Sequence, residues 1–423
     1  MKILVINTGS SSIKYQLFDM DQEKALASGI AEKIGEATSI LTHKIIRSSG
    51  KNLKKVKEGR IADHREGLTQ IVNLLVDEKY GVIKDKSEIA AVGHRVVHGG
   101  EAFQSSTIID EQVITAIKEN IPLAPLHNPP NLIGIEVAKS IFPDSPQVAV
   151  FDTAFHQTIP QKAFLYALPY GLYKKERIRR YGFHGTSHSY VAERAAEYLG
   201  KPLNRLNLIT IHLGNGASMA ALKDGKCVDT TMGMTPLEGL VMGTRSGDID
   251  PAIPFFLAKH LNMSLKEIDN LLNQESGLKG ICGTNDMREV IQKKDKGDKQ
   301  AKIALEIYCY RIKKYIGAYY AALGSLDGVI FTAGIGENSP EVRGLCCEGL
   351  SKLGIKIDPE KNCQTENGIR EISSPNSKVK ILVIPTNEEL KIAQETKRVI
   401  GQRGERCEAR GNSQGLIEKW RLS

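Results

Sequence analysis

The sequence contains one pattern of apolar residues and glycines twice. Apolar β-forming runs at residues 3–6 and 208–213 each lead into a glycine turn and a second run of strand-forming residues. A constant offset of 205 residues, close to half of the 423-residue chain, aligns Gly9 with Gly214, Leu17 with Leu222 and Asp19 with Asp224. A third strand is expected after each copy, at 25–31 and at 226–231. Two glycine hairpins can resemble each other by chance, but the shared register favours an internal duplication and two related domains.

Helical patterns alternate with further strands in the rest of the chain. One helix is expected at 131–142, after two prolines, and another at 187–199, beginning at a serine and ending before Gly200, as capping preferences favour. Further strands are expected at 89–92, 147–151, 329–332 and 379–384. This alternation predicts an α/β protein with mixed sheets flanked by helices.

The net charge and its distribution limit the classes of binding partner that can be expected. A net charge of +8 is compatible with nucleic acid, anionic lipid or small anions. The basic clusters lie at 51–57, 177–180 and 293–299. No aromatic ladder accompanies any of them, so they are interpreted as solvated faces, and neither nucleic acid nor a membrane is expected as a partner.

Apolar runs and cysteines suggest where the protein resides. No apolar stretch approaches the roughly 18 residues that cross a bilayer, and the N-terminal run turns polar at Asn7 before a signal-peptide core can form. The seven cysteines are scattered, without a CxxC pair. Together these features favour a reducing cytoplasm.

Three glycine-containing turns are candidates for binding phosphate, because glycine lets backbone N–H groups approach phosphate oxygens closely. They follow the strands that end near Thr8, Leu213 and Thr332, and the third is expected as a turn at 332–338 before a helix that begins near Ser339. No GxxxxGK[ST] motif and no complete GxGxxG motif occurs, which disfavours a P-loop enzyme and a Rossmann dehydrogenase. Each turn alone is equally typical of a plain hairpin, whereas the three together favour a nucleotide.

Two glycine-flanked arginines are candidates for binding an anion. Arg95 follows a strand within residues 93–100, and Arg245 lies within 243–248. A guanidinium group keeps its charge and bonds two phosphate oxygens at once, although a surface ion pair is the alternative for each arginine alone.

Carboxylates and histidines complete the candidate site. Asp152 directly follows a strand and can hold a metal, act as a base, orient an arginine or cap a helix; Glu388 follows the strand at 381–384 and can hold Mg²⁺ or begin a solvent-facing helix. His184 precedes a helix between glycines. Zinc is not expected at the HxxxH pairs, because no HExxH motif accompanies them.

These residues belong to segments through which the sequence resembles the acetate kinase family, from Met1 to about Ile400. The matching segments are 7–14, 152–156, 182–188, 232–251 and 385–389, and the fourth is long enough to be very specific. The resemblance implies two duplicated ribonuclease H-like domains of the actin, Hsp70 and sugar-kinase superfamily, closing like a clamshell on ATP. It implies an N-terminal domain at 1–153, onto which 389–400 packs back, a nucleotide-binding domain at 154–388 and a flexible tail at 401–423.

The resemblance also implies the role of each site residue. Arg95, Asp152, His184 and Arg245 are the catalytic residues, Arg95 also contacts the substrate, Lys14 contacts nucleotide phosphates, and Asn7 and Glu388 hold Mg²⁺, for which Mn²⁺ can substitute. The residues implied to contact ATP or ADP are His212, Leu213, Gly214, Asn215, Gly216, Asp286, Met287, Arg288, Gly334, Ile335, Gly336, Glu337 and Asn338. The methyl group of the substrate is received by Val97, Leu126, Phe183 and Pro236.

The implied activity is the reversible transfer of the γ-phosphoryl group of ATP to acetate, giving acetyl phosphate and ADP. A carboxylic acid with a pKa near ~4.3 is ionised at pH 7, so no general base is needed. The chemical problem is repulsion between negative charges, because two anions must meet during in-line transfer. Cations are needed to offset these charges. Asp152 is therefore better suited to orienting an arginine than to accepting a proton.

Three other functions make different demands on the sequence. Propionate and butyrate kinases differ mainly in pocket volume, and one methylene contributes only ~1–3 kcal/mol to discrimination. A nucleotide-gated binding module of the Hsp70 or actin kind needs an appended peptide-binding domain, and a sugar kinase needs a base and a polar pocket. A cytoplasmic homodimer is a further expectation from the family.

Overall fold

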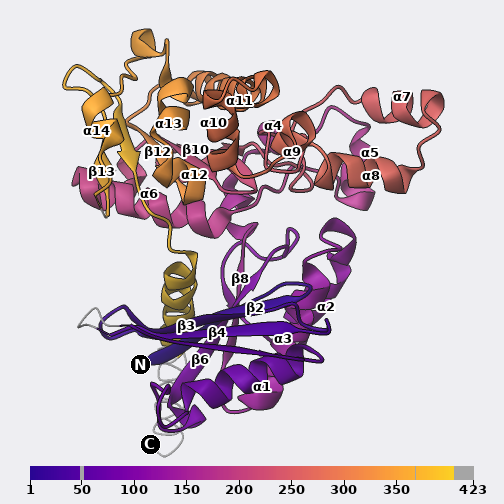
Figure 1. Ribbon diagram of the computed structural model, residues 1–423, viewed down its shortest axis with the longest axis vertical. Helices are drawn as coiled ribbons and strands as arrows, with labels where there is room; N and C mark the ends of the chain where they lie inside the picture. Colours follow the sequence, from indigo (N-terminus) through magenta and orange to yellow (C-terminus); the bar gives the residue numbers. More distant parts are fainter. Residues whose placement is uncertain (48–51, 367, 404–423) are drawn as a thin grey trace, which may run out of the picture. The chain divides into compact units, whose positions relative to one another are not determined.

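The computed structural model describes residues 1–47, 52–366 and 368–403 and divides into two compact units. Unit 1 comprises Met1–Ala154 and the chain from Asn387, and unit 2 comprises Phe155–Thr386. Each unit contains one mixed sheet with helices on its faces (Figure 1), which confirms the predicted α/β class. In these described ranges no helix has the length and apolar content to cross a membrane.

Unit 1 is built on an eight-stranded sheet in the order β5-β4-β3-β2-β1-β6-β8-β7. Its strands are β1 Lys2–Thr8, β2 Ser12–Asp19, β3 Lys24–Glu32, β4 Ser39–Ile45, β5 Leu53–Gly59, β6 Ile89–Val96, β7 Thr107–Ile108 and β8 Gln147–Phe151. β1, β6 and β8 run parallel to one another, while β2 pairs antiparallel with β1. The carboxyl ends of the three parallel strands therefore lie along one edge of the sheet.

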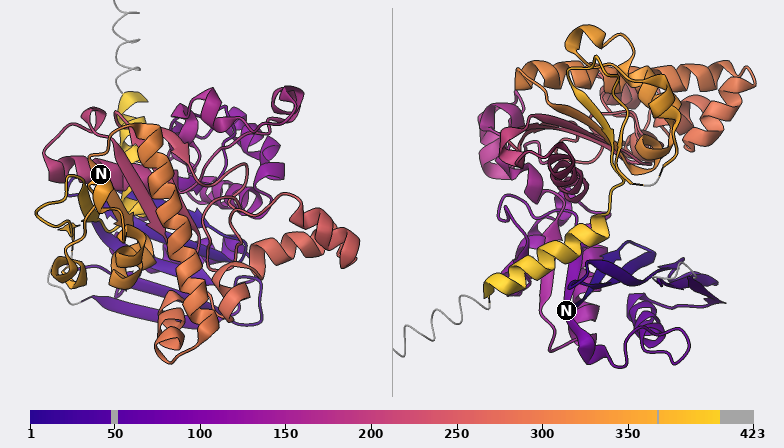
Figure 2. Two further views of the ribbon diagram at one scale, coloured as in Figure 1. Left: turned by 90° about the horizontal axis from the view of Figure 1, so that it is seen from above. Right: turned by 90° about the vertical axis from the view of Figure 1, so that its left-hand side faces the viewer.

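Helices cover both faces of this sheet because its strands alternate apolar side chains between them. Leu4 and Ile6 pack in one core cluster with residues of α1 and α3, whereas Ile3 and Val5 pack in another with Ile392 and Ala393. The latter two belong to a last helix over 388–403, drawn in yellow against the strands in Figure 2. The other helices of this unit are α1 His64–Leu75, α2 Glu111–Glu119 and α3 Asn128–Ile141, with 3₁₀ turns at Lys86–Glu88 and Ile121–Leu123.

Unit 2 repeats the plan of unit 1 in a six-stranded sheet, ordered β11-β10-β9-β12-β14-β13. Its strands are β9 Leu208–Leu213, β10 Ala217–Lys223, β11 Lys226–Thr230, β12 Gly328–Thr332, β13 Arg370–Glu371 and β14 Lys380–Val383. Position by position this order matches β3-β2-β1-β6-β8-β7 of unit 1, and every corresponding pair has the same direction. The duplication predicted from the sequence is thus confirmed.

Most helices of unit 2 surround this sheet. α6 packs on it through Val191, Ala192, Ala195 and Ala196, which share a core cluster with strand residues. α7 and α8 extend away from the rest of the unit (Figures 1 and 2). The helices are α4 Gln161–Phe164, α5 Tyr170–Glu176, α6 Gly185–Leu199, α7 Ile253–His260, α8 Leu265–Gln274, α9 Gly277–Cys282, α10 Met287–Asp295, α11 Lys299–Leu323, α12 Ala333–Asn338, α13 Pro340–Cys347 and α14 Pro359–Cys363, with 3₁₀ turns at Ala154–Thr158, Leu203–Arg205 and Ser351–Leu353.

Two helix starts differ from those predicted. α3 begins at Asn128 and takes both prolines into its first turn, where a missing N–H costs little because it has no partner within the helix. α6 begins at Gly185 rather than at Ser187, and its N-cap residue His184 adopts the left-handed conformation, with φ 57°. Ser187 is not the cap because its hydroxyl bonds Thr386 and His212 instead.

Two further segments are more helical than predicted. The turn expected at 332–338 is wrong: residues 333–338 form the short helix α12, whose first residue, Ala333, has a positive φ of 63°. The last helix continues through residues 401–403, and the guanidinium of Arg398 contacts Glu395 and Gln402 on its surface. The rest of the expected tail, residues 404–423, lies outside the described residues.

Candidate active site

Arg95 and Asp152 meet at the carboxyl ends of two neighbouring parallel strands of unit 1. Arg95 lies near the end of β6, Asp152 directly follows β8, and Arg95 Nη2 donates a hydrogen bond to Asp152 Oδ2 at 2.6 Å. The carboxylate is 1% exposed and the arginine 22%. Burial opposes the positive charge, but Asp152 and Glu388 hold the pKa of Arg95 above its usual value. Arg95 Nε is buried and has no hydrogen-bond partner among the described residues, which therefore satisfy the guanidinium only in part.

Glu388 lies near this pair at the start of the last helix. Burial raises the pKa of Glu388 to about 7, against the opposing influence of Arg95, and its Oε1 is buried without a hydrogen-bond partner. Lys14 also acts on this carboxyl group, and it stands opposite Asn7 in the pairing of β2 with β1. Within the described residues, Glu388 thus offers an unsatisfied carboxylate oxygen, which suits a cation.

The amide of Asn7 and the carboxylate of Glu388 fit Mg²⁺ better than a metal ion that is coordinated entirely by protein side chains. In the described part of the chain, no three His, Cys, Asp or Glu side chains gather where they could hold a metal ion. Mg²⁺ keeps several waters and is commonly bound through one or two carboxylates and substrate phosphates. Asn7 and Glu388 are compatible with that mode of binding.

A cavity of about 1280 Å³ opens in unit 2 beside the carboxyl end of β9. Among the residues expected to contact ATP, those that line it are Gly214, Asn215, Asp286, Met287, Arg288, Gly334, Ile335 and Asn338. Sequence reasoning missed the apolar part of the wall, which includes Ile291, Cys347, Ile355 and Ile357. Isolated apolar residues on helices and loops carry no motif, so nothing in the sequence distinguishes them from core residues.

The remaining residues expected to contact ATP do not line this cavity. Leu213 is fully buried in β9, and His212 Nδ1 forms a hydrogen bond with Ser187 Oγ. Gly336 is buried in α12, where its carbonyl accepts a hydrogen bond from a buried arginine. Glu337 accepts a hydrogen bond from the backbone N–H of Thr386 through its side chain. Gly216 faces other residues of the site.

The turn at 214–216 joins this cavity to two cationic or polar side chains. A Cβ atom added to Gly216 would lie 3.4 Å from His184 Cε1, 3.5 Å from His184 Nε2 and 3.5 Å from Arg245 Nη1. On the other side of the turn, Asn215 accepts a hydrogen bond from Asn285, a cavity residue, and its carbonyl accepts from the N–H of Gly243. Gly214 and Asn215 thus line the cavity while Gly216 faces His184 and Arg245.

Arg245 is a mostly buried cation without a carboxylate partner in the described ranges. Among the described residues, its Nη1 contacts only the carbonyl of Pro236, at 3.4 Å, and the sulfur of Met242, at 3.8 Å. Burial lowers the pKa of Arg245. A buried guanidinium left in this way suits an anionic ligand.

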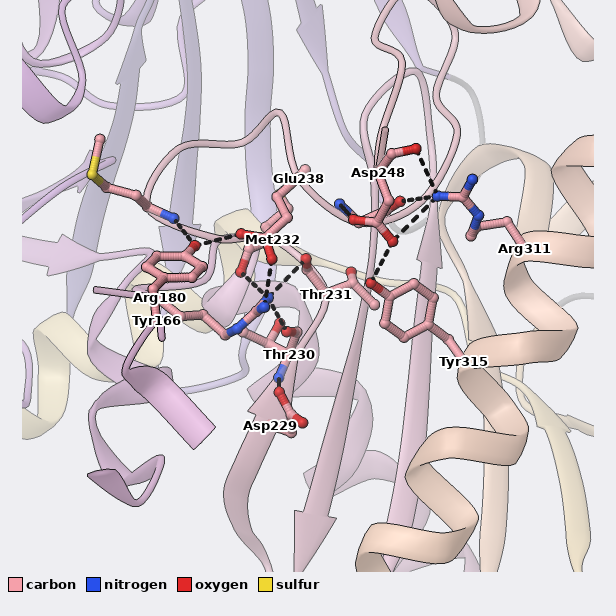
Figure 3. Close-up of polar contacts among 12 residues, drawn as sticks. Tyr166, Arg180, Asp229, Thr230, Thr231, Met232, Glu238, Asp248, Arg311 and Tyr315 are labelled. Atoms are coloured by element: carbon pink, nitrogen blue, oxygen red, sulfur yellow. Dashed lines mark hydrogen bonds and ion pairs between the residues drawn. The ribbon is translucent and has the colours of Figure 1, made fainter. Parts of the chain in front are cut away.

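The irregular loop that carries Arg245 is held from two sides (Figure 3). Arg180 donates to the carbonyls of residues 230–232 and forms an ion pair with Glu238, at 2.5 Å, which Tyr166 also contacts. Farther along, Asp248 accepts hydrogen bonds from Tyr315 and from the N–H of Gly239 and pairs with Arg311 of α11. The sequence did not single out these contacts, because residues so far apart in the chain meet only in the folded unit.

His184 stands at the start of α6 with other histidines around it. Its Nδ1 lies 2.8 Å from Ser218 Oγ, and its ring stacks on that of His212 with centroids 4.2 Å apart. The left-handed conformation at His184 turns the chain into α6 at this point.

The four residues expected to form an apolar pocket differ in exposure. In unit 1, Val97 is buried and Leu126 is 67% exposed; in unit 2, Phe183 is buried and Pro236 half-buried. None of them lines the cavity described above.

Comparison with known proteins adds to these observations. The model of the acetokinase family matches residues 2–394. The acetate kinase of Thermotoga maritima is 58% identical over 407 residues, which are 96% of this chain and 100% of that protein. Among solved structures, the Porphyromonas gingivalis acetate kinase has a TM-score of 0.90 at 46% identity, and a Francisella tularensis propionate kinase has 0.86 at 46%; each alignment covers 94% of this chain and 99% of the other.

Proposed function

The chain belongs to the acetokinase family, and on that premise we propose that it transfers the γ-phosphoryl group of ATP to acetate. Membership makes it a phosphotransferase with a carboxyl group as acceptor, and its fold is that of the actin, Hsp70 and sugar-kinase superfamily. The products are acetyl phosphate and ADP, and the reaction is reversible.

One observation carries the assignment of the nucleotide site. The turn at 214–216 lines the large cavity through Gly214 and Asn215, while Gly216 faces His184 and Arg245. A nucleotide whose base and ribose occupy the cavity would bring its phosphates to this turn, where the half-buried guanidinium of Arg245 has no carboxylate partner among the described residues. The apolar wall suits a base, and the glycines let backbone N–H groups approach phosphate oxygens.

Arg95 and Asp152 are proposed to act on the acceptor side. A carboxylate substrate needs a cation to hold it, and Arg95 retains a buried donor, Nε, that the protein does not use. Asp152 accepts a hydrogen bond from Nη2 of the same guanidinium and thereby helps to fix its direction. Because acetate is already ionised at neutral pH, Asp152 need not remove a proton, so orientation of Arg95 is the role that the contact supports.

His184 and Arg245 are proposed to offset the charge that spreads over the transferring phosphoryl group. Both side chains surround the same point at Gly216, and hydrogen-bond donors held there in advance stabilise the transition state more than the ground state. The contacts of Arg180 and Asp248 with the loop keep Arg245 in place.

A divalent cation is proposed as the cofactor, held by Asn7 and Glu388. Mg²⁺ would supply charge neutralisation on the phosphates, and Mn²⁺ can replace it because both prefer oxygen ligands. The support is the buried Glu388 Oε1 without a hydrogen-bond partner. Lys14, opposite Asn7 on β2, is proposed to contact the phosphates as well.

Acetate is favoured over propionate and butyrate. The T. maritima relative with 58% identity is an acetate kinase, whereas the propionate kinase structure shares 46%. Val97, Leu126, Phe183 and Pro236 are the residues proposed to receive the methyl group, and one extra methylene changes discrimination by only ~1–3 kcal/mol. Propionate is therefore expected as a poorer substrate rather than as an excluded one.

We also propose a homodimer in a reducing compartment, the cytoplasm. Large apolar side chains are exposed on the α7–α8 extension, namely Ile253, Phe255, Phe256, Leu261 and Leu265, and such clusters commonly mark interfaces. Six cysteines are free in the described ranges, and cysteines stay free most readily in a reducing cytoplasm. Light scattering of the protein and of a Phe255→Ser, Leu261→Ser variant tests the dimer.

The activity itself is tested by trapping acyl phosphate as its hydroxamate. Acetate, propionate, butyrate and glycerol are compared with ATP and Mg²⁺ in parallel. We expect the largest kcat/KM with acetate and no phosphorylation of glycerol. A clear preference for butyrate or glycerol would contradict the proposal.

A further inference from the structure

A chain of hydrogen bonds runs from His184 into the interior of unit 2. His184 Nδ1 contacts Ser218 Oγ, the same oxygen contacts His188 Nε2, and His188 Nδ1 contacts Thr210 Oγ1, each at 2.8 Å. Ser218 lies on β10, His188 on α6 and Thr210 on β9, and all three are fully buried. The chain therefore connects the site at Gly216 to the dry interior of the unit.

The hydrogens in this chain can be counted. A hydroxyl group has one hydrogen to donate, and a neutral histidine carries one N–H hydrogen. Over the described ranges, Ser218 Oγ contacts only the two histidine rings, and Thr210 Oγ1 contacts only His188. Burial, together with the neighbouring His156 and His212, lowers the pKa of His188 well below its usual value, so this ring is neutral.

The buried end of the chain sets its direction. If Thr210 accepted a hydrogen bond from His188, its own hydroxyl hydrogen would have no acceptor in a fully buried position, which is unfavourable. Thr210 therefore donates to His188 Nδ1. The hydrogen of His188 must then lie on Nε2 and is donated to Ser218, and Ser218 in turn donates to His184 Nδ1. Every hydrogen in the chain is used.

We propose that Ser218, His188 and Thr210 are positioning residues, which hold the neutral ring of His184 in the tautomer that carries its hydrogen on Nε2. Nε2 is on the side of the ring that faces the Gly216 position, 3.5 Å from a Cβ placed there, as is Arg245 Nη1. The chain thus orients an N–H donor toward the point where Arg245 also lies. The proposal deepens the proposed function, on which its catalytic consequence rests.

Groups around His184 support the neutral form of its ring. The ring of His212 stacks on it, and Arg245 Nη1 lies 3.5 Å from the same Cβ position at Gly216 that His184 approaches. A second positive charge beside Arg245 would be repelled. A neutral histidine stabilises a negatively charged group only through an N–H directed at it, so the tautomer decides whether His184 is a donor.

The first experiment measures the tautomer directly, without substrates. Long-range ¹H–¹⁵N spectra of protein labelled with ¹⁵N-histidine distinguish the two ring nitrogens, and a His184→Gln variant identifies the signals of His184 among the ten histidines. We expect a single Nε2–H form in the unaltered protein. Ser218→Ala should give a mixture of tautomers, Thr210→Val a smaller shift in the same direction, and Ser218→Thr, which keeps the hydroxyl, the original form.

The second experiment measures turnover of the same variants. Ser218→Ala is expected to lower kcat about tenfold to a hundredfold while KM for ATP changes less than about twofold, since residues that orient a ligating or catalytic group commonly have effects of this size. Ser218→Thr should restore most of the rate. Ser39→Ala is the matched control, because Ser39 is a fully buried strand serine with two hydrogen bonds, and it lies in unit 1.

The outcomes separate the two proposals. An unchanged tautomer in Ser218→Ala overturns the positioning role, whatever the rate. A changed tautomer with an unaltered rate overturns its catalytic consequence. Absence of acyl phosphate with every carboxylate tested, in the unaltered protein, contradicts the proposed function instead, and the spectra still test the hydrogen-bond chain.

Discussion

The hairpins β1–β2 and β9–β10 occupy the same place in two sheets of the same plan, but their turns differ by one residue. Thr8 pairs with Ile13 across the turn at 9–12, whereas Leu213 pairs with Ala217 across the turn at 214–216. When β1 and β9 are aligned by the offset of 205 residues, β10 therefore pairs with β9 one residue out of register relative to the pairing of β2 with β1. A shift of one residue changes which side chain stands opposite which, and it moves side chains between the faces of a sheet.

The shift coincides with a change of chemistry. Ile13 packs in the apolar core of unit 1, but the residue 205 positions later is Ser218, which bonds two histidines. Asn7, in β1, corresponds in the same way to His212 in β9. The duplicated sheet thus determines where the proposed ligand-binding groups lie, and replacements at a few of its positions change the side-chain chemistry of each unit.

The two arginines that are proposed to bind anions, one in each unit, also differ in their partners. Arg95 of unit 1 is paired with the buried Asp152, whereas Arg245 of unit 2 has no carboxylate partner among the described residues. A paired arginine contributes to stability as well as to the site. An unpaired buried cation is expected to serve its ligand at a cost to stability.

The largest effect is expected from Arg245→Ala. Loss of a preorganised cation at the transferring group should lower kcat by about 10³-fold, as removal of such donors does in other phosphoryl-transfer enzymes. The melting temperature should stay the same or rise, because a buried charge is removed. Turnover by hydroxamate trapping and calorimetry test both statements. A near-normal rate, or a large loss of stability, would contradict this account of Arg245.

Arg95→Ala should combine a loss of activity with a loss of stability. Truncation leaves Asp152, 1% exposed, as a buried carboxylate without its guanidinium, and breaking a buried pair costs about 3 kcal/mol. We expect kcat/KM for acetate to fall by about 10²-fold. Denaturant unfolding compared with that of Arg245→Ala makes the contrast direct. The double variant Arg95→Ala, Asp152→Asn should regain stability but not activity, and an inactive but fully stable single variant would refute the pairing argument.

Acid should destabilise the two units through different histidines. His94 of β6 is buried beside Gln147, and burial lowers its pKa to about 4. Its unfolded form binds a proton near pH 6.5, so its contribution to stability is present above that pH and is lost as the pH falls from 6.5 toward 4.

This loss amounts to about 2 kcal/mol at pH 5. Urea unfolding at pH 7 and pH 5 measures it, and His94→Gln, which keeps a donor for Gln147, should reduce the pH dependence of unit 1. His188→Gln is the matched variant for unit 2. Equal pH dependence in the His94→Gln and unaltered proteins would show that His94 does not carry the effect.

Much of this arrangement could be predicted from the sequence. The offset between Gly9 and Gly214 indicated the duplicated sheets, because strand and turn signals are local in the chain. The residues that end strands, such as Arg95 and Asp152, were predicted for the same reason: the carboxyl ends of parallel strands lie at one edge.

The rest depends on packing between distant segments. The helix α12 was missed because its glycines, Gly334 and Gly336, suggested a turn, whereas the positive φ at its start belongs to Ala333, which is not a glycine. Ser218 and His188 are separated by thirty positions in the chain, and Arg311 of α11 contacts Asp248 of an irregular loop. No periodicity relates such residues, so only the folded unit shows that they meet.

The last prediction, with the smallest expected effect, compares the two hairpins directly. It replaces one glycine in each turn, Gly9 or Gly216, by alanine. In unit 1, a Cβ at Gly9 would meet Ser12 Oγ at 2.9 Å, and this hydroxyl can rotate away. In unit 2, a Cβ at Gly216 would make ordinary contacts with His184 and Arg245, so the fold tolerates it, but the methyl group fills the space proposed for a phosphate oxygen. We therefore expect Gly9→Ala to change kcat/KM by less than about twofold and Gly216→Ala to lower it about tenfold, with equal melting temperatures. The reverse order would mean that the phosphoryl group lies at the turn of unit 1, and that the shorter turn of unit 2 has no part in the transfer.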